Sequence, residues 1–168
     1  MGLQFGLALF NDCAHIGRSA GGPAIQRVAE QGNPEAFPFP RALRVGPFDF
    51  SFSGLKTAVL RLVQELQVQQ GAKIEAHGQK LVDAAVAPEV QSSLPIKDIA
   101  AGFQAAAVGV LVEKTARAAE QFGAVQVLLA GGVAANKLLR HEMTRLLPVP
   151  VRYPPVALCT DNAAMVAS

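Results

Sequence analysis

The stretch LLAGGVAANK at residues 128–137 decides the fold. It completes a mostly apolar run over residues 125–130, interrupted by Gln126, which has the length of a buried strand. Two glycines follow, and then Leu138, Leu139 and Met143 recur at helical spacing. A strand, a tight turn and a helix in this order predict an α/β unit with a parallel sheet.

The pattern alternates in the same way on both sides of this unit. Pro and Gly residues divide the chain into segments of helical or strand periodicity. Phe48, Phe50 and Phe52 alternate with polar residues and predict a strand. We expect helices over residues 23–31, 55–70 and 99–122, the last capped by Asp98, a strand over residues 149–153, a variable insertion near 71–96, and a final helix that begins at Thr160 or Asp161.

Composition limits the class of protein. The 168 residues are 51% hydrophobic and 17% charged, which predicts a folded chain. The longest apolar stretch, residues 99–112, is too short for a membrane helix, and the N-terminus lacks the pattern of a secretory signal. Cys13 and Cys159 lie far apart, so we expect free thiols in a cytoplasmic protein. A net charge of +2 and a single tyrosine give no sign of a nucleic-acid surface.

Three segments could carry chemistry. Glycines 131 and 132 stand where a helix begins, and such a turn can admit a phosphate or ribose to backbone N–H groups. Asn136 could then bond to a base or a sugar. A plain tight turn explains the two glycines equally well. Lys56 could meet an anion but fits a solvated surface residue better, and Asp161 fits a helix cap better than a metal ligand.

Together these segments resemble the TsaD family, the tRNA adenosine threonylcarbamoyltransferases formerly described as O-sialoglycoprotein endopeptidases. The resemblance rests on FSFSGLKT at residues 50–57, AGGVAAN at 130–136 and CTDNAAM at 159–165, in the family's order. GGP at residues 21–23 and NPEAFPFP at 33–40 add to it. It covers residues 20–168, and three such strings in register are highly specific.

The resemblance implies a fold and a reaction. Family members have the actin-like ATPase (ASKHA, ribonuclease H-like) fold of two α/β lobes around a nucleotide cleft, and residues 20–168 are similar to part of the second, C-terminal lobe. The family moves a threonylcarbamoyl group from threonylcarbamoyl-AMP to N6 of the adenosine beside the anticodon of tRNA. The family pattern puts Gly22 and Asn136 on the adenylate substrate and Asp161 on a divalent metal ion, with iron suspected.

Departures from the family pattern matter too. The family's remaining metal ligands are a histidine pair spaced HxxxH, whereas His15, His77 and His141 each stand alone. His77 and His141 fit surface positions better than ligand positions. Asp12 stands at the wrong spacing for the family's upstream aspartate, and residues 1–19 look atypical. No catalytic residue is assigned to this chain.

The leading interpretation is therefore an incomplete lobe with half of a substrate cleft, inactive or weakly active alone. Implied partners are the missing N-terminal lobe, tRNA, a dimerisation paralogue and a small ATPase, with no membrane. One alternative is a non-catalytic module that binds a partner, and another is a sugar-kinase-like ATP-binding lobe. Peptide hydrolysis is disfavoured because neither a nucleophile with its base nor an HExxH site is present.

Overall fold

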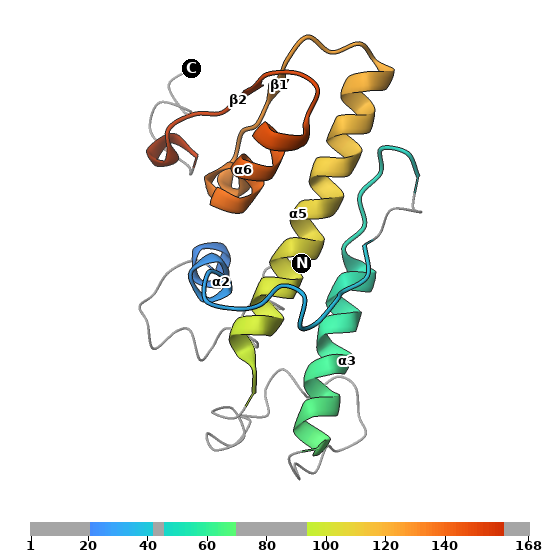
Figure 1. Cartoon of the computed structure of the whole chain (residues 1–168), viewed down its shortest axis with the longest axis vertical. Coiled ribbons are helices and arrows are strands. Elements are labelled where there is room, and N and C mark those ends of the chain that lie inside the picture. Colours follow the sequence, from blue (N-terminus) through green and yellow to red (C-terminus); the bar gives the residue numbers. More distant parts are fainter. Residues whose placement is uncertain (1–20, 42–45, 70–93, 160–168) are drawn as a thin grey trace. The chain divides into compact units, whose positions relative to one another are not determined.

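The computed structural model describes residues 21–41, 46–69 and 94–159. The chain forms two compact units, the first comprising residues 1–40 and 52–105 and the second residues 41–51 and 106–168. Figure 1 labels their helices and strands. The elements are α2 (Gly21–Ala29), α3 (Ser53–Gln69), α5 (Ile96–Gln121), β1 (Val127–Leu128), η3 (Gly132–Ala135), α6 (Lys137–Leu146), β2 (Val151–Arg152) and η4 (Val156–Leu158).

The first unit contains α2, α3 and the beginning of α5. Its described core joins α2 to α5 through three buried alanines, Ala29, Ala100 and Ala101, with Ile25 and Val28 packed against them. Side chains this small let two helices approach closely. The chain after α2 is fixed by a hydrogen bond from the Asn33 N–H to the Asp98 carboxylate, at 2.7 Å.

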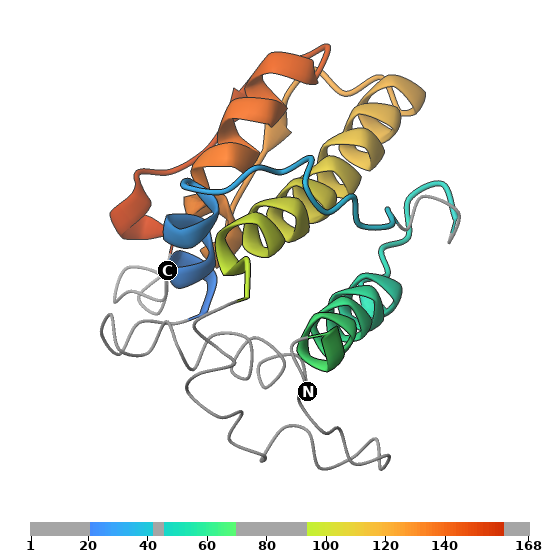
Figure 2. The ribbon, with the colours of Figure 1, turned by 60° about the horizontal axis from the view of Figure 1, so that its bottom comes forward.

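The second unit is a βαβ arrangement built on the rest of α5. β1 pairs in parallel with β2, with Val127 opposite Val151 and Leu128 opposite Arg152. α6 connects the two strands and runs beside the second part of α5 (Figure 2). The core is formed by Val108, Val112, Leu139, Met143 and Leu147, with Val127, Leu129 and Val151 of the strand region packed against it.

The prediction of a strand, turn and helix at residues 125–146 is confirmed in order. The strand itself is shorter and less buried than predicted, since Leu128 is 72% exposed and Val125 is 84% exposed. Only one face of the strand pair has a helix layer among the described residues, because α5 and α6 both contribute to the same core. An apolar run therefore does not by itself indicate burial on both faces.

The predicted strand at Phe48, Phe50 and Phe52 is wrong. Residues 46–52 have no strand pairing, and α3 begins directly afterwards at Ser53. Within the second unit, the buried Lys114 side chain donates to the Gly46 carbonyl at 2.8 Å and to the Asp49 carbonyl. These carbonyls are thus satisfied by a side chain instead of by a neighbouring strand, which periodicity cannot reveal.

The long helix is predicted correctly but begins earlier than expected. α5 starts at Ile96, so Asp98 lies in its first turn and is not its cap. The carbonyl of Pro95 accepts from the Asp98 and Ile99 N–H groups instead. By length and composition α5 is long and apolar enough to cross a membrane. In this structure 56% of its most apolar 18-residue stretch is buried, and the core helix of a soluble protein has the same properties.

Other expectations have mixed outcomes. The helix expected over residues 23–31 is confirmed as α2, and that expected over 55–70 is confirmed as α3. Cys159 is a free, buried thiol as predicted. The insertion near residues 71–96 falls largely, and Cys13 and the final helix fall entirely, outside the described residues.

Candidate functional site

The glycine turn before α6 is the best-defined candidate site. Gly131 has φ 78°, a left-handed conformation that favours glycine, and its carbonyl accepts from the Ala134 N–H at 2.9 Å. Both Gly131 and Gly132 are exposed, and a Cβ added to either would have no heavy atom within 4 Å. The turn therefore leaves open space directly over its backbone.

Asn136 ends this turn and caps α6. It is extended at φ −68° and ψ 120°, and its Oδ1 accepts from the Leu139 N–H at 2.9 Å. It therefore lies at the N-cap of α6, directly before the first helical turn. The cap uses the carboxamide oxygen, whereas the nitrogen of the same group carries two N–H donors. Asn136 thus joins a structural role to a possible binding role.

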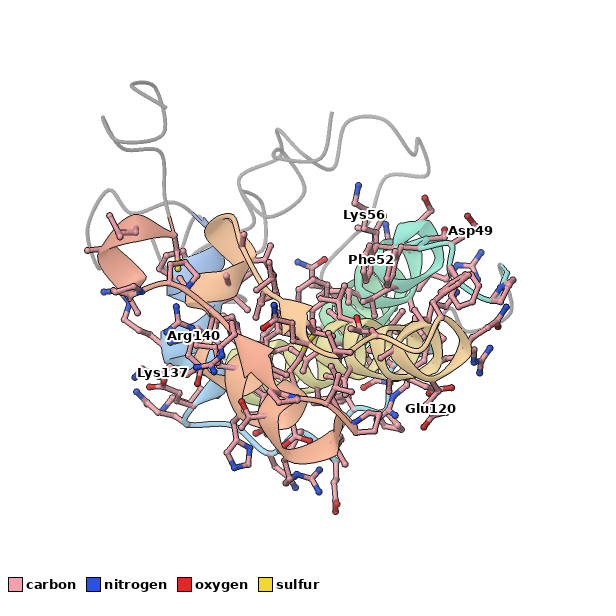
Figure 3. The ribbon with its side chains drawn as sticks, turned by 90° about the horizontal axis from the view of Figure 1, so that it is seen from above. Asp49, Phe52, Lys56, Glu120, Lys137 and Arg140 are labelled. Atoms are coloured by element: carbon pink, nitrogen blue, oxygen red, sulfur yellow. The ribbon has the colours of Figure 1, made fainter. Side chains whose placement is uncertain are left out.

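Arg140, which the sequence analysis did not single out, lies one turn further along α6 (Figure 3). Its Nε donates to the Ala134 carbonyl, and its Nη2 donates to the Pro154 carbonyl at 2.8 Å. Its guanidinium also stacks on the ring of Tyr153, with Cζ 4.4 Å from the ring centroid. An arginine three residues into a helix carries no signal in a periodicity pattern, so sequence reasoning missed it.

Gly22 lies in the first turn of α2, in the first unit. An added Cβ there would also have no heavy atom within 4 Å, so this backbone is as open as the turn at Gly131. Asn136 belongs to the second unit. Asp161, the predicted metal ligand, lies outside the described residues.

Comparison with known proteins places these features in a family. The family described as "TsaD: tRNA N6-adenosine threonylcarbamoyltransferase" matches residues 7–168. The chain belongs to the TsaD family. This match also covers most of residues 1–19, which the sequence analysis regarded as atypical.

Individual TsaD relatives agree. A tRNA N6-adenosine threonylcarbamoyltransferase of Thermomicrobium roseum is 59% identical over 147 residues, 88% of this chain and 40% of the relative. Proteins with the same name are 49% identical in Symbiobacterium thermophilum and 44% identical in Bacillus subtilis, each over 88% of this chain and 38% of the relative. The chain thus spans about two fifths of the length of the curated relatives it matches.

A TsaD metal centre is not formed by the described residues alone. Across residues 21–41, 46–69 and 94–159, no three His, Cys, Asp or Glu side chains gather in a way that could hold a metal ion. His141 lies on α6 with 68% of its side chain exposed, 3.0 Å from a Glu142 oxygen, so its predicted surface position is confirmed. His15 and His77 lie outside the described residues.

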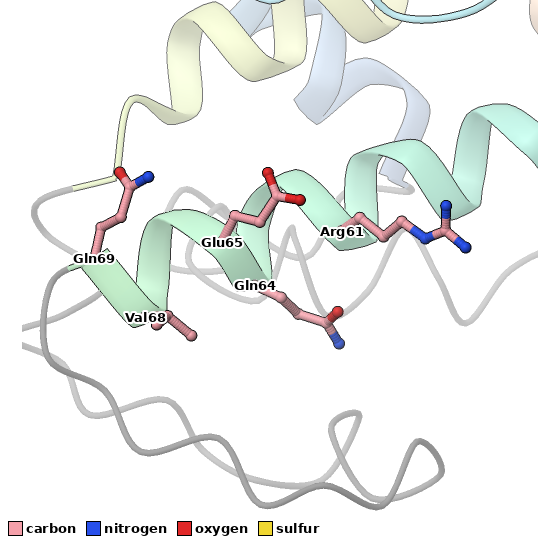
Figure 4. Close-up of a pocket in the computed structure, with 5 residues that line it drawn as sticks. All are labelled: Arg61, Gln64, Glu65, Val68 and Gln69. Carbon is pink, nitrogen blue, oxygen red and sulfur yellow. The ribbon is translucent and has the colours of Figure 1, made fainter.

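The FSFSGLKT segment gives no described cavity. Lys56 lies in the first turn of α3, half-buried. The shallow hollow on this helix lies further along, where Figure 4 shows its lining side chains, all of them from α3 (Arg61, Gln64, Glu65, Val68 and Gln69). None of these residues was predicted to bind a ligand, so the glycine turn remains the stronger candidate.

Neighbouring charged side chains on α6 shift the pKa of the Glu142 carboxylate. The hydrogen bond from Arg145 lowers the pKa of Glu142 below its ordinary value of 4.5, against a smaller opposing effect of desolvation, and His141 adds to the lowering. The same contact, at 2.6 Å, raises the pKa of Arg145. The Arg145 side chain is 55% exposed, so this ion pair serves as a more exposed control for the partly buried contacts of Arg140.

Proposed function

We propose that this chain is the C-terminal-lobe portion, residues 20–168, of a cytoplasmic tRNA N6-adenosine threonylcarbamoyltransferase with the actin-like ATPase fold. In the complete protein, N6 of the adenosine beside the anticodon attacks the carbamoyl carbon of threonylcarbamoyl-AMP. A nitrogen–carbon bond forms, the bond to the AMP phosphate breaks, and N6 loses a proton. The residues of this chain would hold the adenylate for that step.

The observation that carries the proposal is the open glycine turn before α6. Gly131 and Gly132 leave space for a phosphate or ribose over their backbone, and α6 offers the N–H groups and partial positive charge of a helix N-terminus. Asn136, at the end of the turn, would donate a side-chain N–H to the adenylate. For Gly22, in the first unit, the proposal of an adenylate contact comes from the family pattern and from the open space at the start of α2.

The proposed function also includes a metal ion. We propose that Asp161 supplies one carboxylate ligand to a divalent ion, with iron suspected from the family pattern. The described residues do not complete such a site. A single carboxylate gives weak affinity, so the other ligands would come from the N-terminal lobe of the family fold. We therefore expect the chain alone to be inactive or nearly so.

We also propose, from the family pattern, that the complete protein binds a dimerisation paralogue and a small ATPase. One observation also favours the alternative of a partner-binding module: around the strand pair, Leu128, Val133 and Val156 are all more than half exposed. A module of this kind would bind its partner without nucleotide, whereas the adenylate site predicts nucleotide affinity in the chain itself. The family match favours either of these over a sugar-kinase-like lobe.

The test separates the binding role of Asn136 from its capping role. Asn136→Ser keeps a hydroxyl acceptor for the Leu139 N–H but removes the amide donors, whereas Asn136→Ala removes both. In calorimetric titration with threonylcarbamoyl-AMP, both variants should lose about two- to tenfold in affinity, which is the net contribution of one hydrogen bond. Only Asn136→Ala should also lose stability, by about 1 kcal/mol. Unchanged affinity in Asn136→Ser would contradict the proposed contact.

A further inference from the structure

A single side chain in the second unit bonds to both of the segments that follow the paired parallel strands β1 and β2. The Arg140 guanidinium donates to the Ala134 carbonyl, within the turn before α6, and to the Pro154 carbonyl, just after β2. The same Nη2 lies 3.1 Å from Cys159 Sγ. One planar group with several N–H donors in fixed directions can make such contacts at the same time.

The segment after β2 has few apolar anchors of its own. Val156 is 58% exposed and Leu158 is 50% exposed, so the short helix η4 contributes little to the core. Its polar contacts are concentrated on Arg140, Tyr153 and Cys159. The buried Cys159 thiol also reaches the Pro155 carbonyl at 3.5 Å, and Arg140 stacks on Tyr153.

The turn before α6 depends on Arg140 in a similar way. Gly132 and Val133 are exposed, and Ala134 is the buried residue of this short element. Arg140 binds the Ala134 carbonyl with its side chain, while its backbone N–H donates to the Asn136 carbonyl at 3.1 Å. The backbone bond is the ordinary first bond of α6, so the contact specific to the arginine side chain is the one to Ala134, two residues before Asn136.

We infer that Arg140 is a positioning residue that holds the glycine turn with Asn136 and the segment of residues 153–159 in one fixed arrangement. It acts on the ligand through Asn136 and not by its own charge. The coupling of the two segments stands on the contacts alone. Its effect on adenylate affinity rests on the proposed function, and the two are measured separately.

The first measurement follows amide hydrogen exchange in the chain and in Arg140→Gln. The reporters are hydrogen-bonded amides of the two segments, those of Ala134, Asn136, Leu158 and Cys159. We expect exchange to quicken at all four by about tenfold or more, while amides in the middle of α5 stay protected. Arg145→Gln is the matched control, since Arg145 lies on the same helix and its exposed side chain bonds to Glu142.

Unchanged exchange at these amides, or faster exchange in only one of the two segments, overturns the inference. If Arg140→Gln loses protection throughout the unit, Arg140→Lys takes its place. Lysine retains the charge and most of the length but lacks the fork of donors. Faster exchange at both segments in Arg140→Lys supports the inference, and exchange like that of the unaltered chain contradicts it.

The second measurement is affinity for threonylcarbamoyl-AMP in Asn136→Ser, Arg140→Gln and the double variant. A positioning role predicts that Arg140→Gln weakens binding about tenfold and that the double variant is no weaker than the weaker single variant. Multiplying losses would show that Arg140 acts independently of Asn136 and would overturn this part of the inference. If the unaltered chain binds no nucleotide, the proposed function fails, while the exchange measurement still decides the coupling.

Discussion

Some glycines of this chain have no room for a side chain, whereas others face open space, and the two kinds lie in regions with different roles. A Cβ on Gly32 would overlap the Lys97 carbonyl, and one on Gly102 would overlap the Phe37 carbonyl. A Cβ on Gly22 or Gly132 would meet no heavy atom within 4 Å. The first pair is needed for close packing within the first unit, as expected where backbone approaches backbone. Packing does not explain why Gly22 and Gly132 are glycines. A ligand that approaches their backbone would explain it.

The largest expected effect is on the crowded side of this comparison. Gly102→Ala forces a methyl group into the Phe37 carbonyl and within 3.2 Å of the Phe39 ring. Because neither neighbour is a flexible chain end, we expect a loss of about 1–3 kcal/mol in the free energy of unfolding. Urea unfolding followed by far-ultraviolet circular dichroism measures it.

Gly54→Ala is the matched control for Gly102→Ala, because Gly54 is also helical but has open space around it. It should stabilise the chain slightly, as alanine does in a helix. Equal losses in the two variants would remove the distinction between crowded and open glycines.

Gly22→Ala tests the open side in the first unit. Alanine is favoured over glycine within a helix such as α2, so the free energy of unfolding should rise by up to about 1 kcal/mol. If the adenylate approaches this backbone, affinity for threonylcarbamoyl-AMP should fall at the same time. A gain in stability with unchanged affinity would mean that the openness of Gly22 serves no ligand.

The smallest effect is expected at the surface of α6. The Arg145 hydrogen bond lowers the pKa of Glu142, so the contact stabilises the fold above pH 4.5 and is lost as the pH falls through the folded-state value. Arg145→Gln should therefore lower the urea midpoint slightly at neutral pH, and this deficit should shrink as the pH falls below 4.5. The emission of Tyr153, the single tyrosine in a chain without tryptophan, reports the second unit. A larger deficit at low pH than at neutral pH would contradict this sign.

Sequence patterns predicted the elements better than their surroundings. Helical periodicity gave α2, α3, α5 and α6, because apolar spacing depends on local geometry. It failed at residues 48–52, where the distant Lys114 satisfies the Gly46 and Asp49 carbonyls. It also failed at Asp98, because the helix begins at Ile96 and the Pro95 carbonyl accepts its first hydrogen bonds. Both failures come from partners that a local pattern cannot contain.

The candidate site shows the same limit. Gly22, Asn136 and Asp161 came from family strings, and the open space at the first and the N-cap position of the second were visible only in the structure. Arg140 was missed because its side chain binds two backbone carbonyls, that of Ala134 before α6 and that of Pro154 after β2. Every residue has a backbone carbonyl, so the residue types in the sequence do not show which carbonyl will accept from Arg140.

The central claim is that the turn before α6 is open because an adenylate binds over it, and Gly132→Ala tests it most directly. Gly132 has ordinary backbone geometry and open space, so alanine should leave the Tyr153-monitored urea midpoint unchanged. We predict that affinity for threonylcarbamoyl-AMP nevertheless falls by at least about tenfold, because the methyl group occupies the ligand's path to the backbone. Unchanged affinity with an unchanged midpoint would contradict the account.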